Sequence, residues 1–265
     1  MQPIFKLLII TLFFSQINFA QSKLKKAKSN LSDNSFTSNT STTSNSSSSS
    51  SSKNTFLVDL LIEPIIWIGT HTVLGEAEDR SIVPFPYYNG YQGEYSTNYK
   101  QENYKNSLLH INSYYISSKD AVKGLNIDVN YRFTPLIGAE LKHLHLFEKY
   151  FGETEYLDIS SLLFNYYRIR EKYVTAYWGI GLSYIANEVK KVGFSYATGI
   201  EIFPVNPISL SFTWQQNFVN AQAINELKLQ LNYHIKQFSP FIGYYNYNLA
   251  GVKNPSIGFG CNYRF

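Results

Sequence analysis

The sequence predicts an all-β protein, an antiparallel up-and-down β-barrel of about ten strands (roughly 8–12) that crosses a membrane. In the C-terminal segment 256–265, large apolar residues occupy every second position and alternate with glycine and polar residues. The apolar set is Ile257, Phe259, Cys261, Tyr263 and Phe265. Most of the chain from residue 107 onward repeats this period of two, which separates a lipid-facing from a lumen-facing side of each strand. The mean hydropathy of only −0.20 agrees, because alternating strands never build a long apolar run.

The N-terminal segment 1–20 has the organisation of a secretory signal peptide. A short basic start ends at Lys6, an apolar stretch covers 7–14, and small residues lead to Ala20, after which we expect cleavage. The apolar stretch is far shorter than the roughly 20 residues of a membrane-spanning helix, so a membrane anchor is the weaker interpretation. There is no cysteine near Ala20, and this argues against a lipid anchor.

Residues 21–55 are predicted to form a disordered Ser/Thr/Asn-rich linker. The segment 22–28 is basic, and seven consecutive serines occupy 46–52. Because this composition offers little apolar surface to bury, we expect a flexible periplasmic tether that could also bind a periplasmic partner.

Residues 56–106 are predicted to be a periplasmic connection in two parts. Asp59 and Glu63 are four residues apart just before Pro64, which favours a short helix over 56–69, with an extra strand as the alternative. The stretch 70–105 is rich in tyrosine. We expect its aromatic side chains to line the membrane interface or plug the barrel mouth, and stacking on sugars is the alternative.

The barrel itself is assigned to 107–265. The ten expected strands cover 107–117, 124–134, 136–147, 156–168, 173–185, 191–203, 207–217, 224–236, 238–248 and 256–265. The first, fourth and ninth of these show a mixed pattern without clean alternation, so we expect a bulge or register change there. Short proline-containing links on one side predict the periplasmic end, and longer polar links at 118–123, 148–155, 186–190, 218–223 and 249–255 predict the extracellular end.

The inner face of these strands carries a polar cluster. Its members are Asp128, Arg132, Glu140, Lys142, Glu201, Glu226, Lys228, His234 and Arg264. Both signs of charge occur on neighbouring strands, so we expect ion pairs across a nearly closed lumen. A narrow pore and a catalytic cluster are the alternatives. A soluble lipocalin-like barrel would have the opposite facing, with apolar residues inside, and the glycines on the polar face argue against it.

Specific chemistry is poorly supported. His143 and His145 are spaced to chelate a metal, but they share the outward face with Leu141 and Phe147, so we expect interfacial side chains. His110 and His234 are isolated, and no Ser-His-Asp set can be assembled. The formal net charge of +4 is too small to indicate nucleic-acid binding. The sequence therefore assigns no catalytic, cofactor-binding or metal-binding residue, no cofactor and no nucleic-acid partner, and it favours a non-enzymatic role.

Residues 107–265 resemble the small outer-membrane β-barrel proteins of Gram-negative bacteria, particularly those of the Bacteroidota. The resemblance is carried by Tyr131-Arg-Phe-Thr-Pro135, by the alternating strands and by Asn262-Tyr-Arg-Phe265. It implies an outer-membrane location, contact with outer-membrane lipid and lipopolysaccharide, and an assembly signal at Tyr263 and Phe265 that the barrel-assembly machinery reads. Residues 245–255 are also similar to a region of lipid A deacylases, but Tyr245 to Asn248 lack that family's catalytic His and Ser.

The expected function is thus structural, or binding through the loops. The alternatives are a narrow pore and a lipid-modifying or hydrolytic outer-membrane enzyme.

Overall fold

The computed structural model describes residues 22–32, 80–97, 105–220 and 222–265. The predicted signal peptide, the helix or strand expected at 56–69 and most of the serine-rich linker lie outside these residues.

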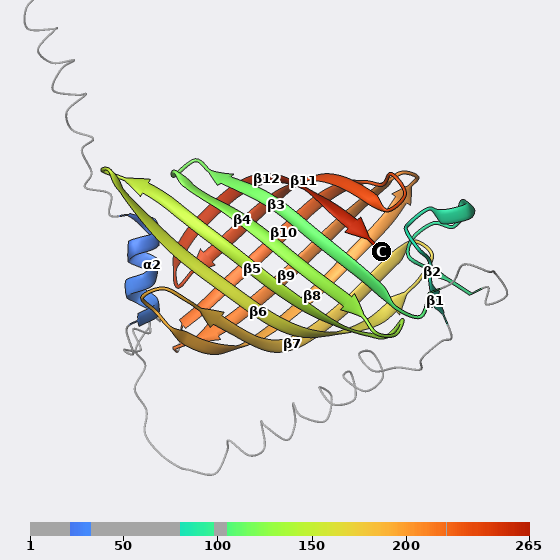
Figure 1. Ribbon diagram of the computed structural model, residues 1–265, viewed down its shortest axis with the longest axis horizontal. Coiled ribbons are helices and arrows are strands. Elements are labelled where there is room, and N and C mark those ends of the chain that lie inside the picture. Colours follow the sequence, from blue (N-terminus) through green and yellow to red (C-terminus); the bar gives the residue numbers. More distant parts are fainter. Residues whose placement is uncertain (1–21, 33–79, 98–104, 221) are drawn as a thin grey trace, which may run out of the picture.

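Ten antiparallel strands form a closed barrel in the order β10-β11-β12-β3-β4-β5-β6-β7-β8-β9 (Figure 1). They are β3 (Leu108–Ser118), β4 (Val122–Arg132), β5 (Ile137–Tyr150), β6 (Glu153–Arg170), β7 (Val174–Ile185), β8 (Lys191–Val205), β9 (Ile208–Val219), β10 (Gln222–Tyr233), β11 (Phe238–Leu249) and β12 (Val252–Arg264). The barrel closes where β12 pairs with β3, from Ser256↔Ser118 to Arg264↔His110. The predicted fold class is therefore confirmed, and each of the ten strands overlaps the segment expected for it.

The two ends of the barrel differ in their connections. At one end β3 begins, β12 ends, and links 133–136, 171–173, 206–207 and 234–237 join the strands; we call this the terminal mouth. At the other end, the distal mouth, the links are 119–121, 151–152, 186–190, 220–221 and 250–251.

The prediction of longer links at the distal mouth is wrong, because the strands continue into them. Phe151 and Gly152 both have positive φ (46° and 87°), and so do Ala250 and Gly251 (49° and 89°). Positive φ at both central residues is the geometry of tight two-residue hairpins. Loop length therefore does not distinguish the two mouths, and the predicted membrane orientation stays a prediction.

The outer surface of the barrel is a belt of large exposed apolar side chains. Leu141 is 56% exposed, Leu229 47% and Ile257 70%. Only lipid solvates such a belt favourably, and a closed barrel is one of the two forms in which a backbone can span a membrane with its hydrogen bonds satisfied. The protein is an outer-membrane β-barrel, and the soluble alternative with an apolar inside and a polar outside is wrong. Among the described residues, no helix is long and apolar enough to cross a membrane.

The glycines on the inner face make room for bulky lumen side chains. A Cβ at Gly199 would lie 2.3 Å from the ring of Tyr177, and one at Gly258 would lie 2.9 Å from the ring of Tyr245. Side-chain atoms do not approach this closely, so glycine is needed opposite each ring. The interior is as crowded as the sequence suggested.

Both mouths are covered by segments that precede the barrel. The helix α2 (Lys23–Ser32) lies on the distal mouth (Figure 1). The strands β1 (Ser81–Ile82) and β2 (Tyr95–Ser96), with the 3-10 turn η2 (Tyr88–Gly90) between them, lie at the terminal mouth.

Over residues 23–32 the helix corrects the prediction of a disordered periplasmic linker at 21–55, and residues 33–55 of that segment lie outside the described residues. Within a basic segment, Leu24, Ala27 and Leu31 fall on one face of the helix, and each is at most 1% exposed. This apolar stripe packs into the distal mouth, on the opposite side of the membrane from residues 80–97.

The apolar lining of the distal mouth also explains why some strands show no clean alternation in the sequence. On the inner face, Leu144, Leu157, Ile159 and Leu249 are buried in one cluster with the helix. Strands that contribute to this cluster are apolar both toward lipid and toward the lumen, so their alternation is lost. A register change between Tyr167 and Ile169 of β6 also falls in one of the three mixed strands.

Candidate functional site: the polar lumen

The structure places all nine predicted cluster residues inside the barrel. They come from β4, β5, β8, β10 and β12, with His234 directly after β10. Their contacts divide the lumen into a charged middle layer, a cavity and a network at the terminal mouth.

The middle layer contains a buried ion pair between Lys142 and Glu226, whose side chains are both 0% exposed. β5 and β10 are five places apart in the ring of ten strands, so this pair spans the lumen. Lys142 Nζ also donates a hydrogen bond to Gln215 Oε1 (2.7 Å). Lys228 Nζ lies 3.5 Å from Asp128 Oδ2 in a second pair across the barrel. These contacts fill the cross-section with side chains that neutralise one another.

On the distal side, Glu148 of β5 fixes the start of α2. Its carboxylate accepts hydrogen bonds from Ser22 Oγ (2.7 Å) and from the backbone N–H groups of Leu24 (2.9 Å) and Lys23 (3.2 Å). A carboxylate at this position satisfies free N–H groups and complements the positive end of the helix dipole.

A buried lysine provides a second anchor for the helix. Lys28 lies between Glu155 and Glu188, with Nζ 3.1 Å from Glu188 Oε1. Burial opposes the charge, but the two carboxylates outweigh it and raise the pKa of Lys28 above its ordinary value. The Lys28 side chain therefore stays positively charged between the carboxylates of Glu155 and Glu188 and holds the helix to the distal mouth.

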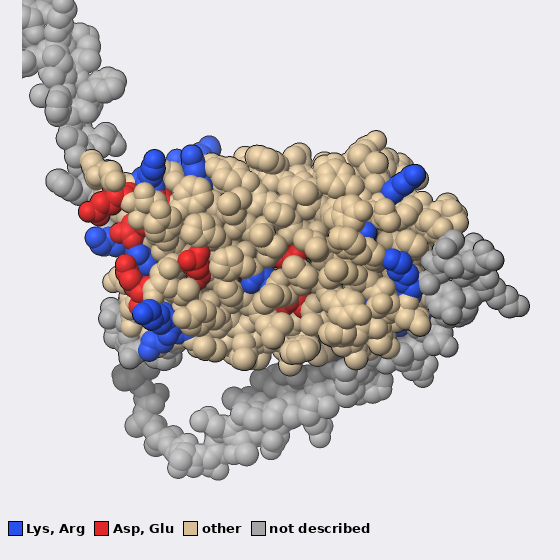
Figure 2. Space-filling model, in the orientation of Figure 1, with Lys and Arg blue, Asp and Glu red and all other residues tan. Residues whose placement is uncertain are grey.

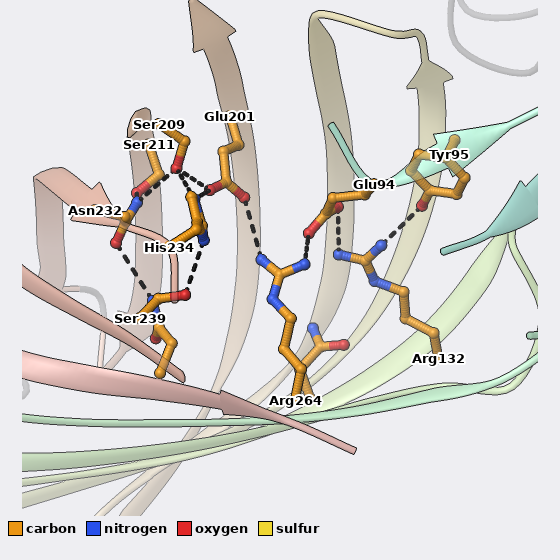
Figure 3. A network of polar contacts seen from close by, with 12 residues as sticks. Glu94, Tyr95, Arg132, Glu201, Ser209, Ser211, Asn232, His234, Ser239 and Arg264 are labelled. Carbon is orange, nitrogen blue, oxygen red and sulfur yellow. Dashed lines mark hydrogen bonds and ion pairs between the residues drawn. The ribbon is translucent and has the colours of Figure 1, made fainter. Parts of the chain in front are cut away.

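At the terminal mouth, Glu94 bridges two arginines that project from the barrel wall (Figure 3). Arg132 Nη2 lies 2.9 Å from Glu94 Oε2, Arg264 contacts the other carboxylate oxygen, and Arg132 Nη1 donates to the hydroxyl of Tyr95 (2.9 Å). Burial alone would raise the pKa of the Glu94 carboxyl, but the two arginines hold it well below its usual range. Glu94 was not identified from the sequence. The signal that could have pointed to it is that two arginines of the cluster lie at the C-terminal ends of β4 and β12, where they need a carboxylate partner.

Tyr87 seals the same mouth. Its hydroxyl donates to the backbone oxygens of Val205 (3.0 Å) and Ile208, and its ring centroid lies 5.7 Å from that of His234. Burial, followed by the negative charge of Glu201, raises the pKa of Tyr87 to about 12, so the phenol remains a donor. Tyr87 and Tyr95 of the tyrosine-rich connection therefore plug the barrel mouth.

A serine–histidine–serine chain beside this plug is not arranged as a catalytic triad (Figure 3). His234 Nδ1 lies 2.8 Å from Ser239 Oγ, and Nε2 lies 2.7 Å from Ser209 Oγ, which itself donates to Glu201 (2.5 Å). A triad needs a carboxylate on the far imidazole nitrogen and a serine that donates to the histidine. Here the hydroxyl of Ser209 donates its proton to Glu201, and Ser209 is fully buried. This series of hydrogen bonds is therefore structural.

Between the middle layer and the plug lies a cavity of about 110 Å³. Its wall includes Glu94, His110, Asn112, Asp128, Asn130, Arg132, Glu140, Tyr167, Thr175, Tyr177, Glu201, Lys228, Gln230, Asn262 and Arg264. The cavity is polar and has room for several water molecules.

His143 and His145 lie on the outer surface, as predicted, and do not share a site. His143 Nδ1 is 2.9 Å from Ser160 Oγ, and His145 Nδ1 contacts Asp158 on the same neighbouring strand. In the part of the chain that the structure describes, no group of three or more His, Cys, Asp or Glu side chains is arranged to hold a metal.

No protein-family model matches the chain, and a search of curated proteins found no match. Among solved structures, the chain is similar to the N-terminal β-barrel domain of OprF from Pseudomonas aeruginosa, with 12% identity, a TM-score of 0.32, and coverage of 61% of this chain and 98% of that one. It is also similar to the NanC porin (9%, 0.38, 58% and 98%) and to Ail, the attachment invasion locus protein of Yersinia pestis (17%, 0.29, 60% and 97%). Scores this low carry no information on ligand or activity. The comparisons show neither a likeness to lipid A deacylases nor an origin in the Bacteroidota.

The C-terminal aromatics lie on the outside of the closing strand. The rings of Tyr263 and Phe265 are 4.7 Å apart between centroids, and the backbone N–H of Phe265 donates to the carbonyl oxygen of Leu109 (2.9 Å). The residues are thus placed at the seam between β12 and β3. Their role as an assembly signal stays a prediction.

Proposed function

We propose that the protein is a closed, non-conducting outer-membrane barrel that has a structural role or binds ligands at its distal surface. The observation that carries this proposal is the Lys142–Glu226 pair, which crosses the lumen with no exposure to water. The apolar layer beneath α2 closes the lumen on the distal side of this pair. Glu94 and its two arginines close it on the terminal side. A hydrated ion would have to break all three barriers to pass.

The distal mouth is the surface best suited to binding. Charged residues gather at this end of the molecule, whereas the middle of the visible face carries few (Figure 2). Lys25 and Lys26 on the outer side of α2 are exposed, as are Lys119, Lys149 and Lys253 around the rim. We infer that this rim binds anionic groups of the membrane surface, with the phosphates of lipopolysaccharide as the expected partners.

Planar bilayer recordings test the proposal. We expect no conductance steps from the purified protein at either polarity, while a porin reconstituted in parallel gives steps. Stable openings of the unmodified protein would contradict the proposal, because they would require a continuous water column through the Lys142–Glu226 layer.

A lipid-modifying enzyme is the second candidate, and the outward Ser160–His143 hydrogen bond favours it. This pair faces lipid and could activate a hydroxyl. However, the backbone N–H groups around it are engaged in the strand pairings of β5 and β6, so the backbone there offers no free oxyanion donor. Identical lipid A and phospholipid mass profiles from cells with the wild-type protein and with Ser160→Ala would exclude this candidate.

A further inference from the structure

The central cavity has an unbalanced charge. Its wall carries four carboxylates and three cationic side chains. The carboxylates are Glu94, Asp128, Glu140 and Glu201, and the cationic side chains are Arg132, Lys228 and Arg264. The excess is one negative charge when all of these groups are ionised.

Glu140 is the carboxylate that lacks a counter-charge. Glu94 has two arginines, Asp128 has Lys228 at 3.5 Å, and Glu201 lies 3.8 Å from Arg264. Glu140 accepts only amide hydrogen bonds, from Asn165 (2.9 Å) and Asn130 (3.5 Å). Within the described residues, no Lys, Arg or His nitrogen lies within ion-pair distance of it.

The same cavity contains buried polar atoms that lack hydrogen-bond partners. Thr175 Oγ1 and Asn262 Oδ1 belong to side chains that are 3% and 5% exposed, and Asn112 Oδ1 is a third such oxygen on the cavity wall. Buried polar atoms are normally paired, so unpaired ones around a cavity indicate something that fills it. The unpaired atoms on this wall are these three oxygens and three nitrogens, Nε2 of His110 and Nε of Arg132 and Arg264. The oxygens suit a cation or the hydrogen atoms of its water molecules, and the two guanidinium N–H groups suit the oxygens of those water molecules.

We propose that the central cavity binds a single monovalent cation, an alkali ion or an ammonium ion, against the carboxylate of Glu140. The bound ion would neutralise the cavity, and water molecules in its shell would donate to the unpaired oxygens. The site is a counter-ion site inside the lumen, on the terminal side of the Lys142–Glu226 layer, and nothing in the proposal requires the ion to pass that layer. It is therefore independent of the proposed non-conducting function.

The test compares urea unfolding midpoints of the full protein in lipid vesicles at constant ionic strength. Sodium, potassium or ammonium chloride is exchanged stepwise for choline chloride, whose bulky cation is a poor fit to the cavity. We expect a saturable rise in the midpoint with at least one of the small cations. The order of the three distinguishes an alkali ion from an ammonium ion.

The matched variants are Glu140→Gln and Asp120→Asn, which removes an exposed carboxylate at the distal mouth. We expect the cation-specific rise to disappear in Glu140→Gln and to remain in Asp120→Asn. Crystals grown in rubidium chloride should show an anomalous peak beside Glu140. Equal midpoints in all four chlorides, or a rise that survives Glu140→Gln, would overturn the proposal and leave the cavity filled by water alone.

Discussion

Breaking the Lys142–Glu226 pair is the most direct test of a lumen that is closed by a water-free middle layer. Lys142→Met removes the charge but keeps a side chain of similar length, so Glu226 loses its ion pair and retains only the amide of Asn217 at 3.4 Å. Glu226→Gln is the reciprocal change. The double variant removes both charges and leaves a neutral layer.

The expected magnitude follows from the burial of both side chains, which are 0% exposed. Removing one partner of a buried pair typically costs about 3–5 kcal/mol, whereas an exposed pair contributes about 0–1 kcal/mol. A buried glutamate without a cationic partner can lose its charge by taking up a proton. For an ordinary carboxyl group this protonation costs about 4 kcal/mol at pH 7 and about 1 kcal/mol at pH 5. We therefore expect Lys142→Met to lose about 3–4 kcal/mol at pH 7 and about 1 kcal/mol at pH 5.

The assay is urea unfolding in lipid vesicles, followed by tryptophan fluorescence at both pH values. The double variant should lie within about 1 kcal/mol of the wild type, because replacing a buried pair by neutral groups is often nearly neutral. Losses below about 1 kcal/mol for both single variants at pH 7 would refute the reasoning, since only water within the middle layer could screen the remaining charge.

Three further predictions test the belt, the plug and the helix. Leu229→Arg should lower the free energy of unfolding by about 2–4 kcal/mol, and Asn225→Arg, near the distal end of the same outer face, by at most about 1 kcal/mol; equal losses would mean that the belt is misplaced. Because the pKa of Glu94 is lowered on folding, its contribution to stability is complete above the ordinary carboxyl value of 4.5 and is lost as the pH falls below it. Urea titrations should show the wild type losing more stability than Glu94→Gln below about pH 4.5, and parallel profiles would contradict the ion pairs of the plug. In a background without the native cysteine, a membrane-impermeant maleimide added to intact cells should label only one of Lys25→Cys and Lys236→Cys, which lie at opposite mouths; equal labelling of both would contradict the position of α2.

The candidate site was only partly readable from the sequence. Alternation placed Lys142 and Glu226 on inner faces correctly, because facing depends only on a residue's position within its own strand. Their pairing depends on two strands that are distant in the sequence and meet across the ring. Glu94 was missed for the same reason, since it lies in a connection with no periodic pattern and acquires its role only where that connection crosses the terminal mouth.

The sequence by itself determined the class of the protein, its strands and their facing. Lipid on one side and a crowded lumen on the other impose a period of two that each strand carries locally, as 256–265 shows. Only the tertiary structure decided how the barrel is closed. Leu24, Ala27 and Leu31 form a helix because an apolar mouth is present to bury them, and a short helix in a basic, serine-rich segment has little stability without such a partner. The turn lengths, the buried ion pairs and the cavity likewise depend on contacts between distant segments, which no local pattern encodes.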